Sequence, residues 1–226
     1  MLGEKGLLKA IRVPTGQQEQ DRQVVRLRDQ LTEDLQRIKS FLLYHSLPEP
    51  EGLDYWSKAS VAALQVCLEV HLEELEKLTS LISRLKDRIK VMAQEVRHAQ
   101  AMRLLETHPG VGTATAMSFL TEVYAPERFN NAKQLVAYVG LAPMVLQSGE
   151  TVRAGPLIKG GCGGVRSKLV EASWTWIRLD RHARTIYRRL VHTTGSVKKA
   201  IVAMARRMAI TLWCMLRRGE AFHWAA

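Results

Sequence analysis

Apolar residues recur every three or four positions in the first part of the chain, which is the spacing of one face of an α-helix. Between residues 17 and 45 the pattern runs through Val24, Leu27, Leu31, Leu35, Ile38 and Leu42, with arginine and aspartate residues between them. It predicts an amphipathic helix over residues 17–45. The prolines and the glycine of residues 47–52 then predict a break and a short connection.

A second apolar stripe is longer and predicts a helix from about Ser57 to Gln100. Its members are Val61, Leu64, Leu68, Leu72, Leu75, Leu78, Ile82, Leu85, Ile89, Met92 and Val96. The spacing is close to a heptad repeat. Two arrangements fit it: an intramolecular hairpin with the helix of residues 17–45, or a coiled coil that also dimerises the protein. Both stay open, because the stripe is longer than residues 17–45 can cover.

The segment from His108 to Thr113 predicts a helix-hairpin-helix turn. Pro109 cannot continue the helix that precedes it, and Gly110 and Gly112 permit positive φ. Thr113 is a candidate cap for a helix that runs to about residue 123. Free N–H groups at the start of such a helix suit a DNA phosphate and carry no base specificity. The predicted DNA-contacting residues are His108, Gly110, Val111, Gly112 and Thr113; the alternative is a tight turn between two helices.

The remaining sequence predicts further helices joined by tight turns. One helix ends at Gly140, and others cover about residues 165–176, 183–191 and 196–216. Residues 144–153 fit a small β-hairpin or an ordered loop, and the glycines of residues 160–164 fit a turn. The predicted fold class is mainly α: a linker remnant over residues 1–16, a helical hairpin or coiled coil over residues 17–100, and a helical domain over residues 101–226.

The positive charge of the chain is concentrated near its C-terminus. Residues 153–226 hold 15 lysines and arginines against 3 acidic residues, whereas residues 1–152 hold 18 against 19. Such an excess favours a phosphate-binding surface whose affinity falls steeply with salt. A solvated basic face or a patch for anionic membranes is the alternative. No apolar run is long enough to span a membrane, and the N-terminus does not have the pattern of a signal peptide.

The cysteines and histidines do not predict a metal site. The three cysteines are Cys67, Cys162 and Cys214; they are far apart and form no Cys-x-x-Cys pair. The seven histidines never pair with a carboxylate at a ligand spacing. We therefore expect a cytoplasmic protein without a metal ion or disulfide of its own.

Ser148 is the best candidate nucleophile, because it lies between an apolar segment and a glycine. Arg153, Lys159 and Arg166 follow it, and each could hold a phosphate next to an attacking hydroxyl. The glycine run over residues 160–164 is not a P-loop, since it lacks the terminal Gly-Lys-Ser/Thr. On these residues alone, a serine-glycine pair is more often simply a turn.

Several of these motifs together resemble one transposase family. They are residues 105–123 with His-Pro-Gly-Val-Gly, Arg128-Phe129, residues 135–143, Gln147-Ser148-Gly149 and residues 166–174. The chain resembles the bridge-RNA-guided insertion-sequence transposases, which are related to the Piv-type DNA invertases. Residues 11–14 and the two long helices also look like the segment between the two catalytic domains of that family.

The resemblance implies an activity and a set of partners. In that family a RuvC-like domain supplies four acidic residues that bind divalent metal, and a second domain supplies a serine that attacks DNA; Ser148 stands at its place. It implies DNA and guide RNA as partners, a homodimer or homotetramer, and a cytoplasmic, nucleoid-associated protein. Mg²⁺ is expected only with the RuvC-like domain.

This sequence also departs from the family. Cys162 stands where an asparagine or serine is common, and no RuvC-like half precedes the long helices. We therefore expect the metal-binding acidic residues to be missing, as in a truncated remnant or a product of internal initiation. The alternative function is a catalytically inactive DNA-binding or regulatory fragment.

Overall fold

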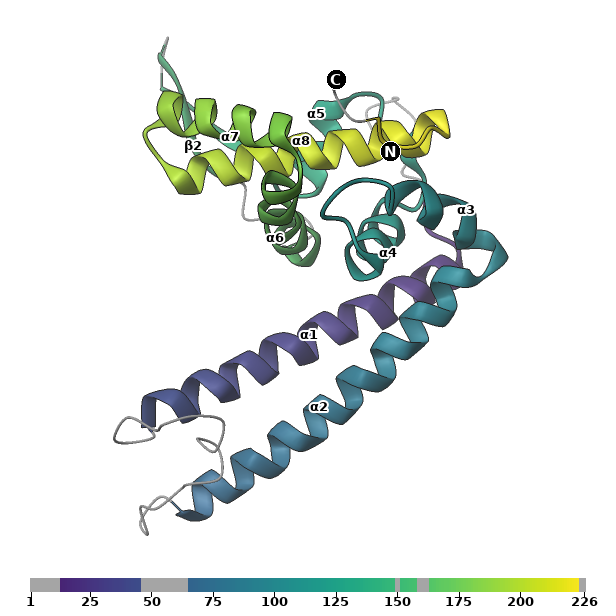
Figure 1. Ribbon diagram of the computed structural model, residues 1–226, viewed down its shortest axis with the longest axis vertical. Coiled ribbons are helices and arrows are strands. Elements are labelled where there is room, and N and C mark those ends of the chain that lie inside the picture. Colours follow the sequence, from purple (N-terminus) through teal and green to yellow (C-terminus); the bar gives the residue numbers. More distant parts are fainter. Residues whose placement is uncertain (1–12, 46–64, 149–150, 158–162, 224–226) are drawn as a thin grey trace, which may run out of the picture. The chain divides into compact units, whose positions relative to one another are not determined.

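The computed structural model describes residues 13–45, 65–148, 151–157 and 163–223 (Figure 1). Helices dominate these residues, and β1 and β2 form the sheet found among them. The predicted mainly α fold class is therefore confirmed. Most of the linker over residues 1–16, the connection after residue 45 and the predicted start of the second helix lie outside the described residues. The chain divides into two compact units, one of residues 23–92 and one of the rest.

In the unit of residues 23–92, helices α1 (Gly16–His45) and α2 (Gln65–Gln94) lie side by side (Figure 1). Ile38 and Leu42 of α1 are buried, and Leu72, Leu75 and Leu78 of α2 pack against them. Part of the apolar stripe of α2 is therefore covered by α1 of the same chain.

The first half of α1 buries a different face from the predicted one. The stripe included Val24 and Leu27, but Val25 is 2% exposed and Leu27 is 47% exposed. Asp21, one turn before Val25, is also buried. Apolar spacing could not predict which face of α1 is buried around Asp21, because a hydrogen-bonded aspartate, and not a hydrophobic residue, occupies the buried position.

The second long helix ends earlier than predicted. Glu95 has a ψ of 142°, and a separate helix, α3 (Val96–Leu105), begins after it. Val96, assigned to the apolar stripe, is 98% exposed. The Arg97 guanidinium donates to the Asp21 carboxylate at 3.1 Å, and Nε2 of His98 lies 2.8 Å from its other oxygen. Prediction of one continuous helix was wrong here, because these contacts with a buried carboxylate carry no apolar signal.

Helix α8 (Val197–Arg218) is central to the second unit (Figure 1). It contacts α3, α5 (Ala132–Tyr138), α6 (Gly163–Leu179) and α7 (Arg181–Thr194). The apolar stripe predicted along it is buried, which confirms that it belongs to the core; its members are Ile201, Met204, Met208, Leu212 and Met215.

The ends of α7 and α8 are set by residues that suit helix termini. The Asp180 carboxylate accepts hydrogen bonds from the backbone N–H groups of His182 and Ala183, at the start of α7. The Ser196 hydroxyl caps α8 in the same way. Gly195 and Gly219 end the two helices with positive φ of 62° and 71°.

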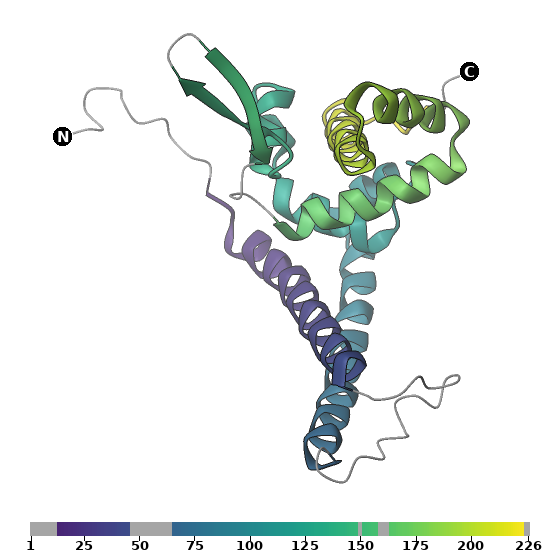
Figure 2. The same ribbon diagram turned by 90° about the vertical axis from the view of Figure 1, so that its left-hand side faces the viewer.

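Residues 143–148 and 151–157 form the paired strands of the β-hairpin, which the sequence left as one of two options. Strand β1 (Pro143–Ser148) pairs antiparallel with β2 (Thr151–Leu157), with an irregularity between Pro143 and Val145. Figure 2 shows the two strands extending away from the helices of their unit. Among the described helices, none is both long and apolar enough to cross a membrane.

Candidate functional site

The predicted helix-hairpin-helix segment lies between two helices, α3 and α4 (Thr113–Val123). Gly110 has a φ of +89°, a conformation that favours glycine. A Cβ at this position would lie 2.5 Å from the Ala172 carbonyl oxygen and 2.8 Å from the Trp176 backbone nitrogen. Gly110 is therefore required where the turn packs against the backbone of α6. Gly112, with a φ of −99°, does not use the positive φ that the sequence allowed.

His108 lies in the core. It is 1% exposed, its ring centroid is 4.7 Å from that of Trp176 and 4.4 Å from that of Phe222, and Nδ1 is 2.9 Å from the Pro109 carbonyl oxygen. Burial lowers the pKa of His108 to about 4, against the smaller opposing effects of the Pro109 hydrogen bond and the Asp180 charge. The ring is neutral at pH 7, so Nδ1 donates its proton to Pro109. Val111, 6% exposed, is also a core residue.

The start of α4 is exposed, as an anion site requires, but a carboxylate is already close to it. Gly112 and Ala114 are exposed. The Thr113 hydroxyl donates to Glu106 at 2.7 Å, and the N-cap is Gly112, so the prediction that Thr113 caps α4 was wrong. A carboxylate near the first free N–H groups already interacts favourably with the helix dipole. A DNA phosphate would have to compete with Glu106 for this helix terminus.

Ser148 is the last residue of β1, at the end of the strand beside the hairpin turn. The register pairs Ser148 with Thr151 and Leu146 with Arg153. The backbones of Ser148 and Arg153 are therefore two pairs apart along the same ladder. Lys159 lies outside the described residues.

Arg166 is held at the opposite end of β1. Its guanidinium donates to the Gly140 carbonyl oxygen at 3.3 Å, just before the strand begins. A strand rises about 3.3 Å per residue, so Pro143 and Ser148 are roughly 17 Å apart. The structure thus brings Arg153 near Ser148 along the hairpin, whereas Arg166 joins α6 to the base of the hairpin.

Arg128, part of a motif noted in the sequence, is enclosed by aromatic rings. Its guanidinium carbon lies 4.3 Å from the ring centroid of Tyr124, 4.4 Å from that of Phe129 and 4.1 Å from that of Tyr138. Its nitrogens donate to the Tyr124 hydroxyl and the Glu122 carbonyl oxygen. Such stacking is stabilising when the cation is shielded from water, so this arginine holds the loop after α4 in place.

Part of the basic surface that the composition predicted lies on α7. Arg181, Arg184, Arg188 and Arg189 are exposed, and no ion pair found among the described residues involves any of them. None of the four is among the site residues predicted from the sequence. The spacing of Arg181, Arg184 and Arg188 by three and four residues was the available signal, since it places all three on one side of a helix.

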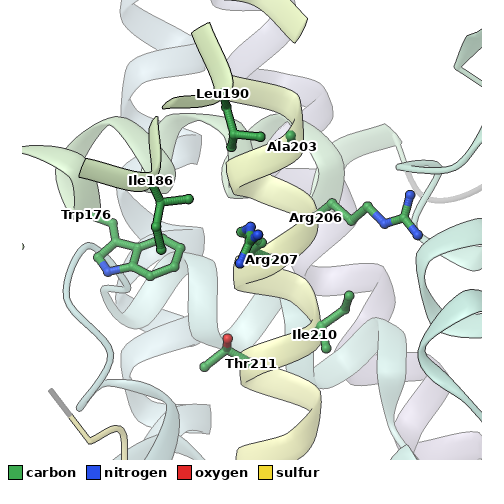
Figure 3. Close-up of a pocket in the computed structure, with 8 residues that line it drawn as sticks. All are labelled: Trp176, Ile186, Leu190, Ala203, Arg206, Arg207, Ile210 and Thr211. Carbon is green, nitrogen blue, oxygen red and sulfur yellow. The ribbon is translucent and has the colours of Figure 1, made fainter. Parts of the chain in front are cut away.

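A groove of about 510 Å³ lies between α7 and α8. Figure 3 shows Ile186 and Leu190 of α7 on one side of it, with Trp176 at one end and Arg207 on α8. Arg206 extends from α8 away from the two α7 residues. The groove combines an apolar lining with cationic groups.

The described residues do not fit a metal centre. Within them, no group of three or more histidine, cysteine, aspartate or glutamate side chains is placed to hold an ion.

The comparisons with known proteins all find similarity to transposases. Residues 102–188 match the family described as the Transposase IS116/IS110/IS902 family. A Sinorhizobium fredii protein named "Putative transposase y4qE" is 29% identical over 95% of this chain and 55% of its own length. A second, "Putative transposase y4rJ", is 28% identical over 96% of this chain and 62% of its own.

A more distant relative is the "Transposase for insertion sequence element IS1111A" of Coxiella burnetii. It is 24% identical over 68% of this chain and 42% of its own length. The chain thus spans little more than half the length of the Sinorhizobium relatives. The matched residues 102–188 include the Gly110 turn, both strands of the β-hairpin and α6, so this part of the chain is similar to the IS116/IS110/IS902 transposase family.

Proposed function

We propose that this chain is the strand-transferring part of an insertion-sequence transposase, with DNA as its substrate and Ser148 as its nucleophile. The observation that carries the proposal is the family match over residues 102–188, which contains the whole hairpin on which Ser148 lies. The position of Ser148 at the end of a strand that extends from the helices supports it, because a duplex can approach such a position.

The chemistry is a transesterification. The Ser148 Oγ attacks a DNA phosphorus and an Oγ–P bond forms. The bond from phosphorus to one deoxyribose oxygen breaks, and the serine proton passes through a general base to that oxygen, which leaves as a hydroxyl. One phosphoester replaces another, so the step needs no external energy source. Arg153, two pairs from Ser148 on the ladder, is our candidate for stabilising the charge that develops on the phosphate. Lys159 is a second candidate.

The exposed arginines of α7 are our candidates for DNA backbone contacts. Because no described carboxylate pairs with them, phosphates can take those positions without breaking an ion pair. Each phosphate neutralised releases counterions, so binding to DNA or to a guide RNA should weaken with salt. We further propose that the protein acts as a homodimer or homotetramer and requires Mg²⁺ bound by a RuvC-like domain.

A second candidate function is DNA binding without catalysis, as in a regulatory fragment. The exposed arginines of α7 favour it, because they can bind phosphates without the help of any reacting group. The two functions differ in one property: the transposase forms a covalent serine–DNA intermediate, and the regulatory fragment does not.

The test compares wild-type protein with Ser148→Ala and with a matched control, Ser167→Ala. Ser167 is an exposed serine of α6 whose hydroxyl donates to the Gly163 carbonyl oxygen. Each chain is supplied with Mg²⁺, guide RNA, the RuvC-like half of a related transposase and DNA carrying the insertion-sequence ends. Two reaction readouts are measured: the covalent protein–DNA adducts that survive SDS, and the recombination products. DNA affinity is measured separately.

Wild type and Ser167→Ala should both give the adduct and the products. Ser148→Ala should give neither, but its DNA affinity should stay within about 2-fold of wild type, since the change removes one hydroxyl and no charge. Products from Ser148→Ala would mean that the nucleophile is elsewhere. Loss of DNA binding in that variant would assign Ser148 a structural role, and DNA binding by wild type without any adduct would support the regulatory function.

A further inference from the structure

Trp174, on α6, has an indole that is incompletely covered. The residue is 45% exposed, although tryptophan is highly buried on average. One neighbour is Tyr187 of α7, whose ring centroid lies 5.6 Å away at an interplanar angle of 69°. An edge-to-face pair of this kind is stabilising and holds the indole in one orientation. The protein therefore presents a large, oriented π-surface to solvent.

The surroundings of this pair are strongly basic. Arg178 lies one helical turn after Trp174, and Arg184 and Arg188 lie close to Tyr187 along α7; all three are exposed. No ion pair found among the described residues involves them.

Two acidic residues are close in sequence, and one of them is buried. Asp180 accepts hydrogen bonds from the Trp176 indole N–H and from two backbone N–H groups at the start of α7. Glu171, one turn before Trp174, is exposed. The charge around the indole is therefore predominantly positive, which is complementary to a phosphate backbone.

The junction of α6 and α7 is also held by a side chain. Arg184 donates from Nε to the Ile177 carbonyl oxygen at 3.2 Å and from Nη2 to the Arg178 carbonyl oxygen at 2.7 Å. These bonds satisfy carbonyl groups that the end of a helix leaves without partners. They fix the position of α7 relative to α6, and with it the position of Tyr187 relative to Trp174.

We propose that Trp174, supported by Tyr187 and flanked by the α7 arginines, is a platform on which an unpaired base of a DNA strand stacks. Exposed aromatic rings in basic surroundings bind single strands in this way, because every base has a π-face and every linkage has a phosphate. A duplex offers the platform no free base face. The inference rests on the proposed function in one respect, that strands are opened when DNA is cut and transferred.

The test uses two substitutions of similar size, Trp174→Phe and Trp174→Leu. Both fill much of the space beside Tyr187, but only phenylalanine retains a π-face. Val197→Ala is the control, because Val197 is an apolar residue of α8 that is 51% exposed. The probes are a single-stranded DNA with 2-aminopurine at one position, a strand of the same length that is abasic throughout, the corresponding RNA, and a duplex. Circular dichroism confirms that each variant is folded.

Wild-type protein, Trp174→Phe and Val197→Ala should bind the single strand and quench 2-aminopurine. Trp174→Leu should bind it about 5- to 10-fold more weakly, the lower end of the range for loss of one stacked base, and should bind the duplex as wild type does. The abasic strand should bind wild type and Trp174→Leu equally. The slope of log K against log salt concentration should not change in Trp174→Leu, whereas Arg188→Gln should reduce it by about 0.7.

Unchanged single-strand binding by Trp174→Leu would overturn the platform. An equal loss on duplex and single strand would also overturn it, since it would show a general effect on folding or charge. A loss seen with RNA but not with DNA would overturn the assignment to a DNA strand. None of these measurements depends on Ser148, so failure of the platform is distinguishable from failure of the proposed transposase function.

Discussion

Substitution of Gly110 by alanine should destabilise the unit that contains the predicted DNA-binding turn, for two separable reasons. The φ of +89° disfavours any residue with a Cβ, which costs about 1–2 kcal/mol. In addition the new Cβ would lie 2.5 Å from the Ala172 carbonyl oxygen and 2.8 Å from the Trp176 nitrogen, both backbone atoms of α6. Relieving such overpacking costs about 1–3 kcal/mol. The expected loss in free energy of unfolding is therefore about 2–5 kcal/mol.

Two other glycines separate these contributions. Gly195 has a φ of +62°, and no atom lies within 4 Å of the position that a Cβ would take, so Gly195→Ala reports the backbone strain alone. Gly112 has a negative φ and equally open surroundings, so Gly112→Ala should cost less than about 1 kcal/mol, as expected for glycine-to-alanine at an N-cap.

Urea unfolding followed by circular dichroism measures the three variants under one set of conditions. The expected order of destabilisation is Gly110→Ala, then Gly195→Ala, then Gly112→Ala, with little change in the slope against urea concentration. If Gly110→Ala were no more destabilised than Gly195→Ala, the close packing of the turn on α6 would be refuted.

Three further predictions concern pH, salt and assembly. Because the pKa of His108 falls from 6.5 to about 4 on folding, the unfolded chain binds more protons than the folded chain between these pH values. The neutral, buried ring therefore contributes about 3 kcal/mol to the free energy of unfolding, which is complete above pH 6.5 and is lost as the pH falls to 4. Urea unfolding across this pH range should show a smaller loss for His108→Gln. The Arg188→Gln, Arg189→Gln double variant should lower the slope of log K against log salt for duplex DNA by about 2, whereas Lys90→Gln, whose ammonium pairs with Asp87, should not; equal slopes would remove α7 from the interface. Light scattering at micromolar concentration should show at least a dimer, and a monomer would leave only the intramolecular pairing of α1 with α2.

The helices of this chain were predictable where apolar spacing alone determines them. The stripe of α8 is buried as expected, because periodic burial of large side chains dominates its stability, and α1 lies close to its predicted limits. Prediction failed at Glu95 and at the phase of α1, where the buried Asp21 contacts Arg97 and His98. Arg97 and His98 follow Asp21 by 76 and 77 positions, and polar contacts over such a separation leave no periodic signal in either segment.

The candidate site likewise has some properties that the sequence predicts and others that only tertiary packing decides. The sequence by itself determined that the chain is mainly helical, that its positive charge lies in the last third, and that Gly110 and Ser148 are in segments with special geometry. These properties depend on residue type and local spacing. Only the tertiary structure decided that His108 is a neutral core residue, that Glu106 lies at the start of α4, that Arg166 is at the base of the hairpin, and that Trp174 and Tyr187 meet on a basic surface. Each of these depends on which distant segments pack together, and that is set by the summed burial and hydrogen bonding of the whole unit.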